Sequence, residues 1–397
     1  MPSDKKTPRP IIAAVAASVF VVLYLALGAF SEYWLGVVTT HPIGDDFKIY
    51  HGALLKANVG QNPYEPYSIG GSFIYHPFAL TFVSLFSWVG DRWTATYLWM
   101  AASLLAWAAA IWLAGRIAQS HLRLTSLFPN EAAEFYFVTL IFLGFAPFWE
   151  TIHIGQINTF VILALLLAFY LAEKDRPWLV GIALALAVVF KTSPLLFVFY
   201  FLALRKFRVV ASATMALAAF SVIASLQFSP RVFVEFFAIL PRLGLEIHPD
   251  PYNQSLLGIL FRTAEFLDPK ALGSSFAVSY RMLSAIVYGI LLVTGLWIYR
   301  EAVTRRGWLF ALLLALMVFA SPLVWYHHST LLLLPLATLI LHPSPRMFAS
   351  GVVLLLLIQS ERLFEHFVTR TAFPTLAAHI LLIGILATAY FKHRLNR

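Results

Sequence analysis

Long apolar runs separated by short polar segments make up most of this chain. The first run, 11–30, follows a polar start that contains Lys5, Lys6 and Arg9. It has the ~20 residues that a helix needs to cross a bilayer, and it exceeds the roughly 7–15 apolar residues of a signal peptide. We therefore expect a retained first span rather than a cleaved signal. Further apolar runs follow at 73–89, 93–114, 135–148, 159–172, 178–190, 195–204, 209–226, 280–299, 308–320, 330–341, 348–358 and 376–391.

These runs predict an all-α polytopic membrane protein with about 11–13 transmembrane helices, because backbone groups in hydrocarbon must form hydrogen bonds within their own segment. No internal repeat or boundary of a soluble domain interrupts the pattern. We therefore expect one integral membrane domain over 1–397, with two large polar segments at 31–72 and 229–279.

Composition supports a chain solvated by lipid. Hydrophobic residues make up 60% and charged residues 12%, against about 25% charged residues in soluble domains. The formal net charge of +9 comes from short basic clusters between apolar runs, so it indicates membrane topology rather than nucleic-acid binding. The cytoplasmic side is expected to hold the N-terminus, Lys174 with Arg176, and the segments 205–208, 300–306 and 392–397.

The same rule places 31–72, 229–279 and 361–375 on the extracytoplasmic side. One conflict arises at the second and third runs. Two full spans between 73 and 114 would put Arg116 and Arg123 outside, against the charge rule. We therefore expect some of the short apolar segments to be half-spans, and the exact number of crossings stays open.

Two adjacent carboxylates, Asp45 and Asp46, lie in the first polar segment. A surface helix over 47–56 would make Asp46 a solvated N-cap. A carboxylate held at a water–lipid boundary would instead gain proton affinity and could serve as a general base. The sequence leaves both interpretations open.

Other polar residues interrupt apolar surroundings. Gln156 and Asn158 would either cap or join helices or bind a substrate. Lys191, in the break Phe190-Lys-Thr-Ser-Pro194, would either reach a surface or bind an anion. The adjacent His327 and His328 point in different directions around a helix and form a poor metal pair.

No nucleotide-binding glycine motif, serine nucleophile motif or carboxylate cage for a metal is recognisable, and the chain has no cysteine. We therefore expect no metal and no cofactor, and an energised donor would have to come from the lipid phase.

The ordered motifs resemble glycosyltransferase family 87 of the GT-C superfamily, the polyprenol-phosphate-mannose-dependent α-mannosyltransferases. The resemblance rests on these elements: Asp46-Phe-Lys-Ile-Tyr50 with Ala53, Gly60 and Pro63-Tyr64, Phe73-Ile-Tyr75-His-Pro77, Gly155-Gln156-Ile-Asn158, Phe190-Lys191-Thr-Ser-Pro194, Asn253-Gln-Ser255 with Arg262, and Ser321-Pro322 to His328. The sequence departs at His76, where the family pattern has a second proline.

The resemblance implies a GT-C fold and an inverting hexosyltransferase, mannosyltransferase-like, in the inner or plasma membrane with an extracytoplasmic active site. The donor would be a polyprenyl-phosphate sugar, and the acceptor a glycolipid or polysaccharide. Asp46 would be the general base, with Asp45 as the second candidate. Lys191, Arg262 and one of His327 or His328 would hold the donor phosphate. The implied substrate-binding residues are Tyr50, Tyr64, Tyr75, His76, Gln156, Asn158, Asn253 and Gln254.

The alternative function is a polytopic transporter or a flippase for lipid-linked sugars. Such proteins usually show inverted repeats and charged residues in helices broken near the middle of the membrane. Only Lys191 approaches that description, so we favour the transferase.

Overall fold

The computed structural model describes residues 20–30, 42–68, 71–122, 131–245, 253–255, 258, 261, 262, 265, 282, 306–321, 323–342, 344–363 and 373–395. Within these residues the chain is helical and contains no strand, and apolar helices dominate. The expectation of an all-α membrane protein is therefore confirmed. The first run is helical over Phe20–Phe30, and its earlier part lies outside the described residues.

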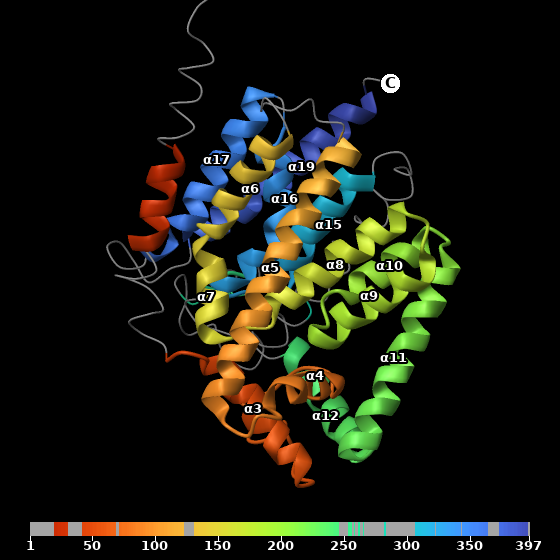
Figure 1. The fold of residues 1–397 in the computed structure, drawn as a ribbon. Helices are drawn as coiled ribbons and strands as arrows, with labels where there is room; N and C mark the ends of the chain where they lie inside the picture. Colours follow the sequence, from red (N-terminus) through yellow and green to blue (C-terminus); the bar gives the residue numbers. More distant parts are fainter. Residues whose placement is uncertain are drawn as a thin grey trace, which may run out of the picture.

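Figure 1 shows how the helices are arranged. Their bounds are α3 Asp45–Asn58, α4 Phe78–Ser87, α5 Arg92–Leu122, α6 Glu131–Leu143, α7 Ala146–Ile154, α8 Asn158–Glu173, α9 Pro177–Phe190, α10 Leu195–Ala203, α11 Phe207–Phe228, α12 Arg231–Leu245, α15 Arg306–Ala320, the 3-10 helix η2 Tyr326–Leu332, α16 Leu333–Ile340, α17 Pro345–Gln359 and α19 Phe373–Leu395.

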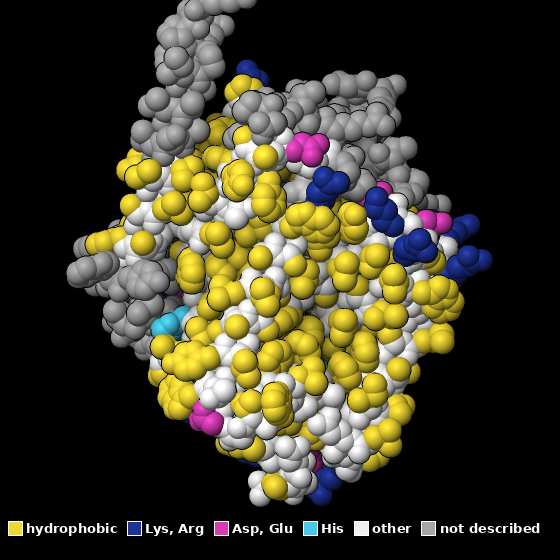
Figure 2. Space-filling view, in the orientation of Figure 1, with side chains coloured by type: hydrophobic (Ala, Val, Ile, Leu, Met, Phe, Trp, Pro, Cys, Tyr) yellow, Lys and Arg dark blue, Asp and Glu magenta, His cyan; other side chains and the backbone are white. Residues whose placement is uncertain are grey.

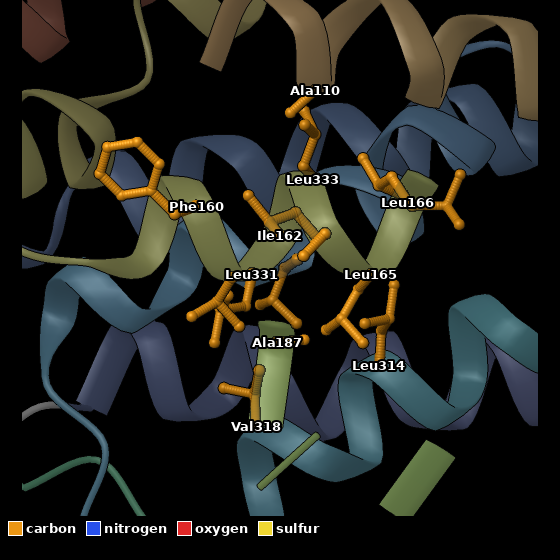
Figure 3. Close-up of a cluster of buried hydrophobic side chains, with 14 of the residues drawn as sticks. Ala110, Phe160, Ile162, Leu165, Leu166, Ala187, Leu314, Val318, Leu331 and Leu333 are labelled. Atoms are coloured by element: carbon orange, nitrogen blue, oxygen red, sulfur yellow. The ribbon is translucent and has the colours of Figure 1, made fainter. Parts of the chain in front are cut away.

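Helix α8 lies at the centre of the fold. Its side chains pack on α5, α9 and η2, and Figure 3 shows Ile162 and Leu165 among apolar side chains of several helices. Most of its side chains are buried among apolar neighbours, whereas Leu167 is exposed, so the helix is largely enclosed. Its first residue, Asn158, is therefore held rigidly inside the molecule.

The direction of α5 resolves the conflict over Arg116. Trp99 of α5 packs on Phe160 of α8, and Trp112 packs on Tyr170, so the two helices run in the same direction. Arg116 therefore lies at the same end as the turn after α8, which contains Lys174 and Arg176.

Of the two runs in this conflict, 73–89 does not form a helix of spanning length. Helix α4 has only 10 residues and packs against α3 and the later part of α11, where Phe78 stacks on Phe220. It starts after Pro77 and stops before Gly90, so the continuous apolar sequence hides a short helix. A single crossing by α5 would place Arg116 in agreement with the charge rule, while Arg123 lies outside the described residues.

Helices α9 and α10 form a hairpin of two short helices. The turns at both of its ends line one small cavity, to which Arg176 and Lys206 both contribute. Helix α10 has 9 residues, which span only ~14 Å at 1.5 Å per residue. Lys191 lies at the inner tip of this hairpin.

By length and composition, two helices of the described residues are able to span a membrane alone, Arg92–Gln119 and Phe207–Phe228, and the pair α6 and α7, bent by 56°, would make a third. The remaining apolar helices there are shorter. The expected number of spans therefore stays a prediction. Figure 2 shows hydrophobic side chains over the middle of one face and most Lys and Arg side chains towards its upper end.

The bend between α6 and α7 is stabilised by Gln359 at the end of α17. The amide of Gln359 accepts a hydrogen bond from the backbone N–H of Ala146 at 2.9 Å and donates to the carbonyl of Gly144 at 2.6 Å. Because these backbone groups would otherwise be unpaired in an apolar interior, one side chain makes the bend possible. The bend directs α7 towards the polar residues described next.

Candidate active site

Asp46 lies in the first turn of α3 and does not cap it. The helix begins at Asp45 after Gly44, whose φ is 70°, and no side chain caps it. The carboxylate of Asp46 instead accepts a hydrogen bond at 2.5 Å from Nε2 of Gln156, which lies between α7 and α8. The interpretation of Asp46 as a solvated N-cap is therefore wrong. Asp45, one residue earlier and therefore about 100° away around the helix, points in a different direction.

Close backbone contacts hold α3 against α7. The N–H of Gly44 donates to the carbonyl of His153 at 2.7 Å. Gly155 ends α7 with φ 74°, and a Cβ there would lie 2.7 Å from Cβ of Phe47. Only glycine allows both this conformation and this approach. The contacts fix Asp46 opposite Gln156.

The amide of Gln156 has one allowed orientation. Its Oε1 accepts hydrogen bonds from the hydroxyls of Tyr50 at 2.6 Å and Tyr75 at 3.1 Å, and from the N–H of Ile157 at 2.8 Å. Its Nε2 must therefore face Asp46, and it also lies 3.5 Å from Nε2 of His327. Burial and the charge of Asp46 raise the pKa of Tyr75, so this hydroxyl stays protonated and donates.

Asn158 and Lys191 continue the polar site. Asn158 is fully buried and donates to the carbonyl of His327 at 3.3 Å. Its Oδ1 accepts a hydrogen bond at 3.1 Å from Nζ of Lys191, at the tip of the α9–α10 hairpin. The structure thus brings together Asp46, Gln156, Asn158, Lys191 and His327 from four separate segments.

The surroundings of Asp46 raise its pKa from the ordinary value of 3.8 to about 7. Burial is the largest cause, followed by the negative charges of Asp45 and Glu150, whereas the positive charge of Lys191 acts in the opposite direction. Helix α3 also favours the ionised form, since Asp46 lies at its positive N-terminal end. A carboxylate with a pKa near 7 is suited to general base catalysis.

The remaining expected residues build the walls of the site rather than its centre. Asn253 accepts a hydrogen bond from the N–H of Val324 at 3.0 Å, the N–H of Gln254 donates to the carbonyl of Val324 at 2.6 Å, and Arg262 donates to the carbonyl of Asn253 at 2.7 Å. These contacts shape the segment before η2. They position His327 without meeting Asp46.

Three further expected residues also make contacts with neighbouring protein groups. His328 accepts a hydrogen bond from the N–H of Trp325 at 2.7 Å. Tyr64 donates to the carbonyl of Tyr75 at 2.9 Å, and His76 lies 3.2 Å from the hydroxyl of Ser221. Tyr64 therefore supports Tyr75, and His76 joins the first polar segment to α11.

Sequence reasoning missed Glu150 and Arg362. Oε1 of Glu150 lies 3.1 Å from Nδ1 of His327, and its Oε2 lies 2.5 Å from Nη2 of Arg362. A carboxylate within an apolar segment was the available signal, because such a group is costly there without a partner. The arginine, 212 residues later, gave no comparable signal.

The site contains a carboxylate that can accept a proton, Asp46, an ammonium group, Lys191, and the amide donors of Gln156 and Asn158. No group of three or more histidine and acidic side chains able to hold a metal occurs in the described parts of the chain. The chemistry that this set supports is proton removal by Asp46 next to an anion bound at Lys191.

Comparison with known proteins identifies the family. No curated protein and no solved structure is found to match the chain. The family model of glycosyltransferase family 87 matches residues 73–322, well over half of the chain. The matched part includes Gln156, Asn158 and Lys191, whereas Asp46 and His327 lie on either side of it. Because the match covers more than half of the chain, the chain belongs to glycosyltransferase family 87.

Proposed function

We propose that this glycosyltransferase is an inverting enzyme that takes a sugar, with mannose expected, from a polyprenyl phosphate. The acceptor is a hydroxyl group of a glycolipid or polysaccharide. The observation that carries the proposal is the carboxylate of Asp46, partly exposed and held by Gln156 within a helical membrane protein.

The reaction follows from this carboxylate. The acceptor oxygen attacks the anomeric carbon of the donor, its proton passes to Asp46, and the bond between that carbon and the phosphate oxygen breaks. The bonding electrons leave with the polyprenyl phosphate. Attack opposite the leaving group inverts the configuration at the anomeric carbon. Oδ2 of Asp46 is occupied by Gln156, and in the described part of the chain no donor is found for Oδ1, so we assign Oδ1 as the proton acceptor.

Lys191 is the cation that we assign to the donor phosphate. Its ammonium group has three donors, and its hydrogen bond to Asn158 uses one. Charge on the phosphate grows as the bond breaks, so a fixed cation there stabilises the transition state more than the bound substrate. Arg262 and His328 are second candidates. We assign His327 to a different role, because its two ring nitrogens face Gln156 and Glu150.

The orientation of the site supports an extracytoplasmic reaction. Helix α3 packs near the beginning of α5, where Phe47 contacts Trp99, and the basic turns with Arg116, Lys174 and Arg176 lie at the other end of α5 and α8. Basic segments stay on the cytoplasmic side. Asp46 would therefore face the opposite side of the plasma or inner membrane.

The test is sugar transfer by the purified full-length protein in liposomes, with radiolabelled polyprenyl-phosphate sugars and a crude lipid extract as acceptor. We expect transfer from one of these donors, none from sugar nucleotides, and a loss of about 10²–10⁴-fold in Asp46→Asn. The matched control is Asp45→Asn, which should keep most of the activity. Transfer retained in Asp46→Asn would refute the assigned base, and transfer from sugar nucleotides alone would refute the donor.

A further inference from the structure

A buried ion pair outside the motifs named in the sequence analysis lies behind the proposed base. We propose that Glu150 and Arg362 are positioning residues that orient His327 and, through Gln156, set the geometry and the proton affinity of Asp46. The inference rests on the proposed function of Asp46, and it adds two residues that touch neither the donor nor the acceptor.

The contacts form a continuous chain. Arg362 donates to Oε2 of Glu150 at 2.5 Å, and Oε1 of Glu150 lies 3.1 Å from Nδ1 of His327. Nε2 of His327 lies 3.5 Å from Nε2 of Gln156, which in turn donates to Asp46 at 2.5 Å. Glu150 and His327 are 6% and 8% exposed at their side chains. Most of this series of contacts, from Arg362 to Asp46, is therefore shielded from bulk water.

Hydrogen positions follow from the acceptors. The carboxylate of Glu150 accepts only, so Nδ1 of His327 carries the hydrogen and Nε2 of the neutral ring keeps its lone pair. That lone pair meets the second N–H of Gln156, whose first N–H bonds Asp46. Glu150 thus selects the tautomer of His327 that accepts from Gln156.

The backbone of His327 needs no help from Glu150. Its carbonyl accepts hydrogen bonds from the side chains of Thr151, Asn158 and Thr330, at 3.3, 3.3 and 2.8 Å. These contacts anchor η2 whatever occupies position 150. Glu150 therefore acts on the ring, and its loss should alter the tautomer and the rotation of that ring more than the fold.

Arg362 explains how Glu150 remains charged at this depth. A buried carboxylate without a partner is strongly unfavourable, whereas a close guanidinium compensates much of the cost. Arg362 also lies over the ring of Tyr326 in η2, with 5.0 Å between its Cζ and the ring centre. The arginine therefore connects the end of α17 to the helix that carries His327.

The pair also makes an electrostatic contribution that the experiment can isolate. The negative charge of Glu150 raises the pKa of Asp46. The other charged or titratable groups of the described residues that face Asp46 are Asp45 and Tyr50 on α3, Tyr75 in the first polar segment, Lys191 from the α9–α10 hairpin and His327 on η2. None of these residues is itself substituted in the variants at position 150 or 362, so a shift in the protonation of Asp46 reports on the pair, acting directly or through the ring of His327.

The test measures the pH dependence of kcat for full-length Glu150→Gln and Arg362→Gln in liposomes, with the lipid-linked donor that supports wild-type transfer. Both should lower kcat by on the order of 10²-fold, the expected cost of a misplaced catalytic group. The acidic limb of the profile should move to lower pH in Glu150→Gln, which removes a negative charge. It should move to higher pH in Arg362→Gln, which leaves Glu150 uncompensated.

Charge-preserving controls separate geometry from charge. Glu150→Asp and Arg362→Lys should keep the acidic limb at its wild-type position, and they also serve if the neutral variants fail to fold. Wild-type kcat in the neutral variants, or a reduced kcat with an unmoved limb in all of them, would overturn the inference. If Asp46→Asn retains transfer, the proposed function itself fails. If Asp46→Asn is inactive and the limbs do not move, only the role of Glu150 and Arg362 fails.

Discussion

The environment of Asp46 should impose a pH dependence on both activity and stability, with opposite signs. Its pKa is raised from 3.8 to about 7. Only the ionised carboxylate removes a proton, so the rate of transfer should fall about tenfold for each pH unit below 7 and level off above it. The ordinary carboxylate of an exposed aspartate would give a flat profile over this range.

The same shift makes Asp46 a stability cost at neutral pH. The folded state binds a proton that the unfolded chain has already lost between pH 3.8 and 7, so the free energy of unfolding falls as pH rises through this window. A shift of roughly 3 pKa units corresponds to about 4 kcal/mol, an upper bound for a partly exposed group. Substitution by asparagine removes the titration and still offers a carbonyl oxygen to Gln156.

The assay compares wild type with Asp46→Asn by thermal unfolding in detergent at pH 5 and pH 8, alongside transfer from pH 5 to 8. We expect the inactive variant to unfold at a higher temperature than wild type, by a margin that is larger at pH 8 than at pH 5. A variant that is less stable than wild type at pH 8, or a wild-type rate that does not change over this range, would refute the reasoning.

Two further predictions concern the phosphate and the contact between helices. Lys191→Met should lower kcat/KM by at least 10²-fold, because the growing charge on the phosphate loses its cation. The matched control is Lys174→Met, at an exposed lysine after the far end of α8. Equal losses in both variants would contradict the assignment. Gly155→Ala should destabilise the fold by about 1–3 kcal/mol, because position 155 has φ +74° and an added Cβ would lie 2.7 Å from Cβ of Phe47. The control is Gly52→Ala in α3, where an added Cβ meets nothing within 4 Å. It should be neutral or stabilising in the same thermal unfolding assay.

Much of the fold was predictable because lipid solvation restricts the backbone. Apolar runs had to be helical, and the basic turns marked one side. The nature of the run 73–89 stayed open, because run length alone did not separate a spanning helix from the short α4. Its packing on α3 and α11 decides this, and packing is not visible in a hydrophobicity pattern.

The candidate site was predictable where polar residues interrupt an apolar run. Gln156, Asn158 and Lys191 stood out for that reason, and the structure brings them next to Asp46. The starting residue of α3 was wrong, since Gly44 begins the helix through its left-handed backbone conformation. The ion pair between Glu150 and Arg362 could not be predicted, because two residues separated by 212 positions leave no local signal in a single sequence.

The location of the site follows from the helices that stop inside the molecule. Helix α7 ends at Ile154, α8 begins at Asn158 and α9 ends at Phe190. The last carbonyl groups and first N–H groups of such helices lack partners within the helix and require polar company. In a membrane domain this requirement places amides, hydroxyls and water next to the helix ends. The free energy of burying a charged side chain is therefore lower there than among apolar helices. The proposed base, Asp46, and the proposed cation, Lys191, therefore lie close to the ends of interrupted helices. The sequence features that mark these ends are Gly155, Pro194 and the segment before η2.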